Sequence, residues 1–236
     1  MPESDMLNTN VESRNIKAVV FDLDGTLLDT APDFVYVLNK LREEEGLPAL
    51  DDTTIRNTVS DGARALVTLG FGLQEGDEGF EPLHLRLLEL YKQHLAVKSA
   101  PFAGISELLE FIEQAQLSWG IATNKPEIYT TPLLAALGLK PDCVICPDHV
   151  ENRKPHPESM HLAAKLLNCN PEEIIYVGDH ARDIECGRQA GCPTIAAAYG
   201  YINKRDDIDN WQATYRVDHA QEMIAIVQSY LPMTKG

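Results

Sequence analysis

The chain has 236 residues, 44% of them apolar, and a formal net charge of −16. This length and composition indicate a globular protein with an ample core, built as one large domain or as a core with a small insert. The negative charge argues against nucleic acid or an anionic membrane as a partner, and no apolar run approaches transmembrane length. An anionic substrate would need positive charge supplied at its own site.

The N-terminal segment and the cysteines indicate the cellular setting. Residues 1–15 are polar and acidic with no apolar signal core, and we expect them to form a loose arm. Five cysteines without a secretory signal indicate reduced thiols in a cytoplasmic protein. Cys143 and Cys146 have the spacing of a metal or redox pair, but no second pair of ligands completes a zinc site. A buried strand is therefore the simpler interpretation of this segment.

The first predicted strand is the apolar run 18–21. A helical pattern follows it, with Thr30 as a possible N-cap. Two more helical patterns cover about 63–69 and 82–96, with no convincing strand between them. Residues 33–98 therefore indicate an all-α block that is inserted just after the first strand.

From about residue 101 the pattern changes to alternating helices and strands, which predicts a parallel sheet with helices on both faces. We therefore predict an α/β fold with a doubly wound parallel sheet. Residues 16–32 and 99–236 would form this core, and residues 33–98 would form an all-α cap. The predicted helices are 105–114, 126–137, 157–167, 184–190 and 220–230, and the predicted strands are 117–122, 143–146, 174–177 and 194–197.

Two acids, Asp22 and Asp24, follow the first strand directly. The alternation of side chains breaks at a strand exit, so both carboxylates can turn toward one site. Acids this close repel each other unless a cation or hydrogen bonds offset their charge. They suit a Mg²⁺ site in which one carboxylate attacks and the other moves protons. Gly25 lets the backbone bend tightly and Thr26 adds a hydroxyl, although a plain Asp-Gly turn is the alternative.

Other polar residues follow the later strands, where binding sites form in open parallel sheets. Thr123 and Asn124 can donate hydrogen bonds to phosphate oxygens, although such a pair is also common in ordinary turns. Lys154 offers a positive charge to a phosphoryl group, or is a solvated loop residue. Asp179 and Asp183 add two more acids, and Asp183 alone would also serve as the first acid of a helix. In this order, these residues favour a site for phosphate and metal.

Four motifs of this chain resemble those of the haloacid dehalogenase (HAD) superfamily of phosphatases. They are the segments 22–26 and 123–124, Lys154, and the segment 178–183. The resemblance covers nearly the whole chain from Ala18 onward, and the helical insert is similar to that of members with a small helical cap. It implies a Rossmann-like core carrying an all-α cap.

The resemblance also implies a role for each motif residue. Asp22 would attack phosphorus and form an aspartyl-phosphate, while Asp24 would protonate the leaving group and then activate water. Mg²⁺ would be held by Asp22, the backbone carbonyl of Asp24, and Asp179, with Asp183 in support. Lys154 would act in catalysis through its charge. The phosphoryl group would be bound by Gly25, Thr26, Thr123, Asn124 and Lys154.

Two neighbouring groups of the superfamily resemble the chain overall, the N-acetylmuramic acid 6-phosphate phosphatases and the phosphoglycolate phosphatases. Phosphoglycolate enzymes more often have a serine or threonine at the place of His180, and a second glycine near Ser60. We therefore expect the sugar phosphate to be the substrate. The first group is nearer to this chain in the segments 29–34, 59–64, 145–150, 178–180, 199–201 and 210–211.

The cap is expected to select the substrate. A glycine-containing turn over residues 60–62 leads into a helix that carries Arg64, and its amides and guanidinium suit a carboxylate or a sugar hydroxyl. Arg64 is alternatively a surface arginine, and Arg182 is alternatively an ion-pair partner of Asp183. The candidates for substrate specificity are Ser60, Asp61, Gly62, Arg64, His180 and Arg182.

The sequence thus predicts a Mg²⁺-dependent phosphomonoesterase for a small phosphorylated metabolite. We expect a monomer or homodimer with no nucleic-acid or membrane partner. Two alternatives come from other functional classes. A phosphosugar mutase of the same superfamily shares every motif, and a non-catalytic sugar-phosphate binder would use the same pocket. Free phosphate, measured against isomerised product, distinguishes the phosphatase from the mutase.

Overall fold

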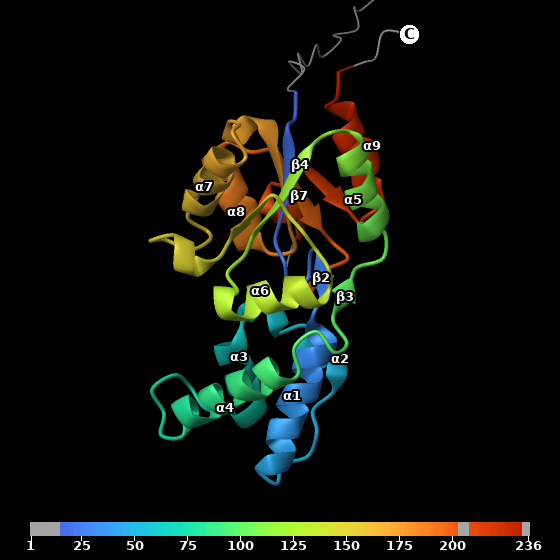
Figure 1. Ribbon diagram of the computed structural model, residues 1–236. Coiled ribbons are helices and arrows are strands. Elements are labelled where there is room, and N and C mark those ends of the chain that lie inside the picture. The colour runs from blue at the N-terminus through green and yellow to red at the C-terminus, as the bar shows by residue number, and fades with distance from the viewer. Residues whose placement is uncertain (1–14, 203–207, 233–236) are drawn as a thin grey trace, which may run out of the picture.

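The computed structural model describes residues 15–202 and 208–232, which form a parallel sheet with helices on both faces (Figure 1). The strands lie in the order β5-β4-β1-β6-β7-β8, and every neighbouring pair is parallel. The predicted α/β fold with a doubly wound parallel sheet is confirmed. The strands are β1 Ala18–Phe21, β4 Ser118–Ala122, β5 Cys143–Ile145, β6 Ile174–Gly178, β7 Thr194–Ala197 and β8 Tyr215–Val217.

The sheet has an apolar core on each face, which explains why its central strands are apolar at every position. Val19 and Phe21 belong to one core, and Ala18 and Val20 belong to the other. One face is covered by α5 Ile105–Gln114, α6 Glu127–Ala136 and α9 Glu222–Ser229. The other is covered by α7 Glu158–Leu166 and α8 Ala181–Ala190.

Four helices that follow β1 form a separate block with its own apolar core. Figure 1 shows them together at one end of the molecule, beyond α6 and away from α9. Leu38, Leu66 and Leu87 come from three different helices and are fully buried in this core. The four are α1 Ala31–Glu44, α2 Asp52–Arg56, α3 Ala63–Phe71 and α4 Phe80–Gln93.

A short antiparallel ribbon connects this helical block to the sheet, because β2 (Leu28–Asp29) pairs with β3 (Ala100–Pro101). The fully buried carboxylate of Asp33 accepts hydrogen bonds from the backbone N–H groups of Lys98 and Ser99, and from the Ser99 hydroxyl. These bonds tie the start of the block to its end. The division of the chain into a core and a cap stays a prediction. The predicted boundaries of the cap, at residues 33 and 98, lie next to this ribbon.

Several details of the predicted helices were wrong. α3 runs two residues past its predicted end, because the helix continues through Gly70 and is capped by Gly72, whose φ is +71°. A Cβ added to Gly70 would lie 2.9 Å from Cδ1 of Leu38. α8 begins three residues earlier than predicted, because His180 at its N-cap accepts a hydrogen bond from a backbone N–H of the first turn. Thr30 does precede α1, but its side chain makes no capping hydrogen bond.

The cysteines lie where the strand interpretation placed them. All five are free, and Cys143 and Cys146 are buried in and directly after β5. Burial raises the pKa of the Cys143 thiol to about 12 and that of Cys146 to about 11, so neither thiol ionises near neutral pH. In the described part of the chain, no helix has the length and apolar character needed to cross a membrane. Apart from Asn15, the predicted arm of residues 1–15 lies outside the described residues.

Candidate active site

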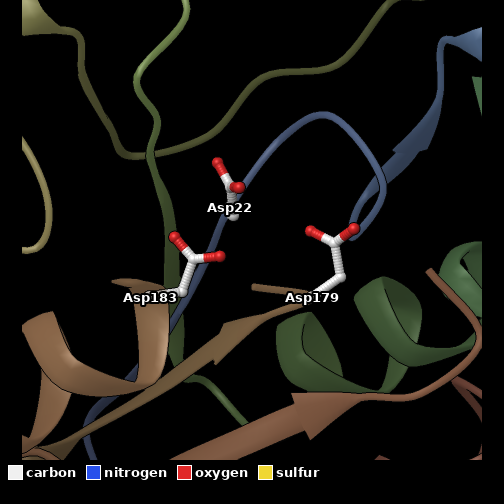
Figure 2. A group of neighbouring side chains, drawn as sticks. All are labelled: Asp22, Asp179 and Asp183. Carbon is white, nitrogen blue, oxygen red and sulfur yellow. The ribbon is translucent and has the colours of Figure 1, made fainter. Parts of the chain in front are cut away.

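Three buried carboxylates meet at the carboxyl ends of two neighbouring strands (Figure 2). Asp22 directly follows β1, Asp179 directly follows β6, and Asp183 lies in the first turn of α8. Each offers a carboxylate oxygen within 4.8 Å of those of the other two, and none is more than 5% exposed. The register that places Phe21 beside Val177 brings the first two acids together. We call these three residues the acidic triad.

The surroundings of Asp179 show what the acidic triad can hold. Its carboxylate accepts hydrogen bonds from the hydroxyls of Thr26 and Ser60 and from the backbone N–H of Tyr201. Burial, followed by the charges of the other two acids, raises the pKa of Asp179 to about 7. Three buried carboxylates are costly to ionise together unless a cation joins them, and oxygen ligands suit Mg²⁺ or Ca²⁺. The acidic triad therefore fits a divalent cation.

Lys154 supplies a buried positive charge next to two of the three acids. Its Nζ lies 2.9 Å from Oδ1 of Asp22 and 2.7 Å from Oδ1 of Asp183. It also donates hydrogen bonds to the backbone carbonyl of Ala122 and to the hydroxyl of Tyr176. Burial alone would lower the pKa of Lys154, but the charges of Asp183 and Asp22 outweigh it and raise the pKa. Lys154 is therefore charged at every physiological pH.

Asp24 is held by contacts of its own, apart from the acidic triad. Its Oδ1 accepts a hydrogen bond of 2.5 Å from the hydroxyl of Thr30 and one of 2.9 Å from Nζ of Lys125. Neither contact involves Oδ2 of the same carboxylate. The side chain of Asp24 thus faces the cavity described next with one oxygen engaged.

A cavity of about 590 Å³ opens between the core and the helical block. Its wall brings together most of the residues that the sequence singled out. Five of them are absent from that wall: Gly25, Thr26, Asp179, His180 and Asp183. Those that line it are Asp22, Asp24, Ser60, Asp61, Gly62, Arg64, Thr123, Asn124, Lys154 and Arg182.

Gly25 and Thr26, which were expected at the phosphoryl group, both contact an acid of the triad, and their role at the phosphoryl group stays a prediction. Thr26 is fully buried and its hydroxyl donates to Oδ1 of Asp179 at 3.1 Å. Gly25 has a φ of +84°, and a Cβ added there would lie 2.1 Å from Oδ2 of Asp179. Glycine is required at this position by both its backbone conformation and the close approach of the carboxylate.

Thr123 and Asn124 lie on the cavity wall after β4, and both have local partners. The hydroxyl of Thr123 accepts a hydrogen bond from the backbone N–H of Lys125. The amide of Asn124 donates to the backbone carbonyl of Lys154 at 3.1 Å. Because the Thr123 hydroxyl accepts in this contact, its own proton stays available to a phosphate oxygen. Asn124 fixes the loop that carries Lys154.

The turn over residues 60–62 contacts the first turn of α8. Arg182 donates a hydrogen bond to the backbone carbonyl of Ser60. Nε2 of His180 lies 3.8 Å from Oδ1 of Asp61, and the neighbouring His180 lowers the pKa of Asp61. Four of the residues predicted to select the substrate therefore bind one another across the boundary between block and core.

Arg64 lies at the cavity wall with its charge already paired. Its guanidinium lies 3.0 Å from Oε1 of Glu75 and 3.1 Å from Oε2 of Glu81. It also packs over the ring of Phe80, and its side chain is 43% exposed. Arg64 thus resembles the surface arginine that was the alternative interpretation of this residue.

Sequence reasoning missed a second set of residues on the cavity wall. Lys125 directly follows Thr123-Asn124, so its position at the strand exit was the available signal. The aromatic members had no such signal, because an aromatic residue at helical spacing is usually a core residue. The missed residues are Phe34, Val59, Ala63, His84, Leu88, Tyr91, Lys125, Pro126, Tyr129 and Arg153.

Comparison with known proteins agrees with this geometry. Residues 19–197 match the family model of the haloacid dehalogenase-like hydrolases. An N-acetylmuramic acid 6-phosphate phosphatase of Pseudomonas putida is 48% identical over 92% of this chain and 98% of that protein. A phosphoglycolate phosphatase of Xanthomonas campestris is 37% identical over 88% of this chain and 94% of its own length.

A solved structure, described as a predicted phosphoglycolate phosphatase from Haemophilus somnus, has the same fold. Its TM-score is 0.79 at 24% identity, over 91% of this chain and 99% of that one. The parallel sheet and the buried acids at its strand exits are those of a hydrolase with an α/β fold. The chain belongs to the haloacid dehalogenase-like hydrolases, the family that its four motifs predicted.

Proposed function

We propose that the protein is a Mg²⁺-dependent phosphomonoesterase that works through an aspartyl-phosphate. One observation carries this proposal: Asp22, Asp24 and Lys154 line one cavity, and Asp22 also belongs to the acidic triad. A nucleophile, a proton carrier, a fixed cation and a metal site are what phosphoryl transfer requires. The similar phosphatases from Pseudomonas putida and Xanthomonas campestris support the same reaction.

In the first half of the proposed reaction, a carboxylate oxygen of Asp22 attacks phosphorus. The bond from phosphorus to the ester oxygen breaks, and Asp24 gives its proton to that oxygen. In the second half, Asp24 takes a proton from water, whose oxygen attacks phosphorus and releases the carboxylate of Asp22. Lys154 holds Asp22 in place throughout by the 2.9 Å contact to its Oδ1.

Mg²⁺ would be held by the three acids of the triad, with the backbone carbonyl of Asp24 as a further proposed ligand. When bound, it would supply positive charge that offsets both these carboxylates and the phosphoryl group. Thr123 would donate its hydroxyl proton to a phosphoryl oxygen, and Asn124 would keep Lys154 in position. Gly25 and Thr26 would act by supporting Asp179.

For the substrate we propose N-acetylmuramic acid 6-phosphate. The cavity of about 590 Å³ is the size of pockets that enclose sugar-sized ligands, about 300 to 1,000 Å³. Tyr129, a partly exposed aromatic residue of its wall, suits the apolar face of a sugar ring. The 48% identity to the Pseudomonas putida enzyme supports the same choice.

Phosphoglycolate is the second candidate, favoured by the similarity to the Xanthomonas campestris enzyme. A two-carbon acid would leave most of this cavity to water. A phosphosugar mutase would give isomerised product without free phosphate, and a non-catalytic binder would give neither. These outcomes are distinguishable in one assay.

We also propose that residues 33–98 act as a cap on the core. The contact of Arg182 with Ser60 would hold this cap closed, and the β2–β3 ribbon would be the place where it pivots. Closure would exclude water that is not positioned for attack. A variant lacking the block would test this division, since it should lose discrimination between esters while the core still folds.

The proposed function is tested by measuring phosphate release from N-acetylmuramic acid 6-phosphate and 2-phosphoglycolate side by side, with Mg²⁺ and with EDTA. We expect turnover of the sugar phosphate that EDTA abolishes. Asp22→Asn, which changes volume little, should lose this turnover and still unfold cooperatively on heating. Preference for phosphoglycolate would overturn the substrate, and activity in Asp22→Asn would overturn the covalent mechanism.

A further inference from the structure

Lys125 is a buried cation that the proposed reaction leaves without a role. It follows β4 at the cavity wall, and its side chain is only 6% exposed. Its Nζ lies 2.9 Å from Oδ1 of Asp24, a contact that joins two strand exits of the core. Burial alone would lower the pKa of Lys125, but the charge of Asp24 contributes to a net rise, so the lysine stays charged.

Two aromatic rings of the helical block lie next to the same ammonium. Nζ of Lys125 lies 4.6 Å from the ring centroid of Tyr91 in α4 and 5.0 Å from that of Phe34 in α1. The two rings stack on each other with their centroids 4.0 Å apart and their planes 8° apart. Because the rings stack on each other, Nζ lies beside the pair and can face only one of them, where a cation is attracted to the ring. Lys125 is thus a core residue held from both sides, by Asp24 and by the block.

The contacts of Asp24 divide its carboxylate into two different oxygens. Both Thr30 and Lys125 bind Oδ1, while the hydrogen bonds found among the described residues leave Oδ2 without a protein donor. Since Asp24 lines the cavity, Oδ2 is the oxygen that can carry a proton to and from the reacting group. The orientation of Oδ2 therefore depends on what holds Oδ1.

We propose that Lys125 is a positioning residue for proton transfer by Asp24. By binding Oδ1 it directs Oδ2 toward the ester oxygen, and the rings of Phe34 and Tyr91 keep the ammonium in that place. This inference rests on the proposed phosphatase function. The proton goes from Oδ2 of Asp24 to the ester oxygen as the bond to phosphorus breaks, and later returns from water to Oδ2. Lys125 itself gives up no proton.

A role of Lys125 at the phosphoryl group is the competing explanation. The geometry favours the positioning role, because the ammonium is bonded to Asp24 and lies next to two rings. Lys154, by contrast, contacts the nucleophile Asp22 directly. The two roles predict different dependence on the leaving group. Proton delivery by Asp24 speeds the departure of a basic alkoxide leaving group strongly and that of p-nitrophenolate little. Contact between Lys125 and the phosphoryl group would instead affect the rates for both esters equally.

The test measures kcat/KM of Lys125→Met with Mg²⁺ for p-nitrophenyl phosphate and for an alkyl phosphate such as the sugar phosphate. We expect a loss of about 100-fold for the alkyl ester and of less than about fivefold for the aryl ester. Lys125→Arg should recover much of the alkyl activity, because it restores the charge. Asp24→Asn should likewise lose kcat/KM much more for the alkyl ester than for the aryl ester.

Lys40→Met is the control, since the side chain of Lys40 on α1 is 42% exposed and pairs only with Glu43 among the described residues. Thermal unfolding of each variant shows whether it folds, and Lys125→Gln replaces the methionine variant if that one does not. An equal loss for both esters, or no loss, would overturn the positioning role. Wild-type protein without Mg²⁺-dependent phosphate release would instead overturn the proposed function.

Discussion

Removal of divalent cations should make the protein less stable as the pH rises toward neutrality. The pKa of Asp179 is about 7 in the folded state, against an ordinary value of 3.8, because of burial and two neighbouring acids. Between these values the folded state keeps a proton that the unfolded state has lost. The free energy of unfolding therefore falls as the pH rises, and the decrease levels off above the folded pKa.

The size of this effect follows from the difference in pKa. About three pKa units correspond to a total of about 4 kcal/mol, of which about 2 kcal/mol falls between about pH 5.5 and about pH 7.5. Asp179 is only 2% exposed, so water screens the effect little. The pKa of Asp183 is also raised, mainly by burial, which acts in the same direction. The window lies above the pH range in which exposed carboxylates titrate and below the pKa of the buried thiols, so neither group contributes to the expected slope.

The assay is urea unfolding followed by circular dichroism, in EDTA, at several pH values within this window. Wild-type protein should lose about 2 kcal/mol across the window, and Asp179→Asn should show a clearly smaller slope. Mg²⁺ should restore stability to the wild-type protein mainly at the upper end, because it competes with the proton for the carboxylate. A flat or rising curve for metal-free wild-type protein would refute the reasoning, as would an unchanged slope in Asp179→Asn.

Two further changes address the junction and the cavity. Asp33→Ala should lower the free energy of unfolding by about 3 kcal/mol in urea, because it removes the acceptor of the buried Ser99 N–H and hydroxyl and of the partly buried Lys98 N–H. Asp52→Ala, an exposed control on α2, should change it little, and equal effects would contradict this account. Arg153 is exposed on the cavity wall and, among the described residues, its side chain has no ion pair. Arg153→Gln should lower kcat/KM about tenfold for N-acetylmuramic acid 6-phosphate, which carries a carboxylate, and leave N-acetylglucosamine 6-phosphate unchanged. Equal losses for both esters would contradict carboxylate binding.

The parallel core could be predicted from the sequence because burial on both faces leaves a simple pattern. β1 is apolar at all four positions, and Asp22 marks the place where the strand ends. Strand exits of a parallel sheet lie at one edge, so acids that are far apart in the chain were expected to meet. The structure places Asp22, Asp179 and Asp183 together in this way, although their roles in catalysis stay predictions.

Other features depend on contacts that no local pattern encodes. The strands β2 and β3 have two residues each, too few for any periodicity to be visible. Lys125 acquires its surroundings from Asp24 and from rings of two distant helices, which sequence spacing cannot reveal. The pairing of Arg64 with Glu81 likewise depends on how α3 and α4 pack. The sequence therefore points to a charged residue more readily than to the residue with which it forms an ion pair.

The charges around the acidic triad give a physical reason why phosphate binding would depend on the proposed metal. Lys154 is matched by Asp22 and Asp183, and Lys125 is matched by Asp24. With Asp179 ionised as well, these six side chains carry four negative and two positive charges, on a chain whose net charge is −16, although Arg153 and Arg182 also line the cavity. A phosphate dianion approaching the metal-free site would meet repulsion in a poorly screened environment. A divalent cation in the acidic triad reverses this balance, so we expect phosphate affinity to depend steeply on metal occupancy.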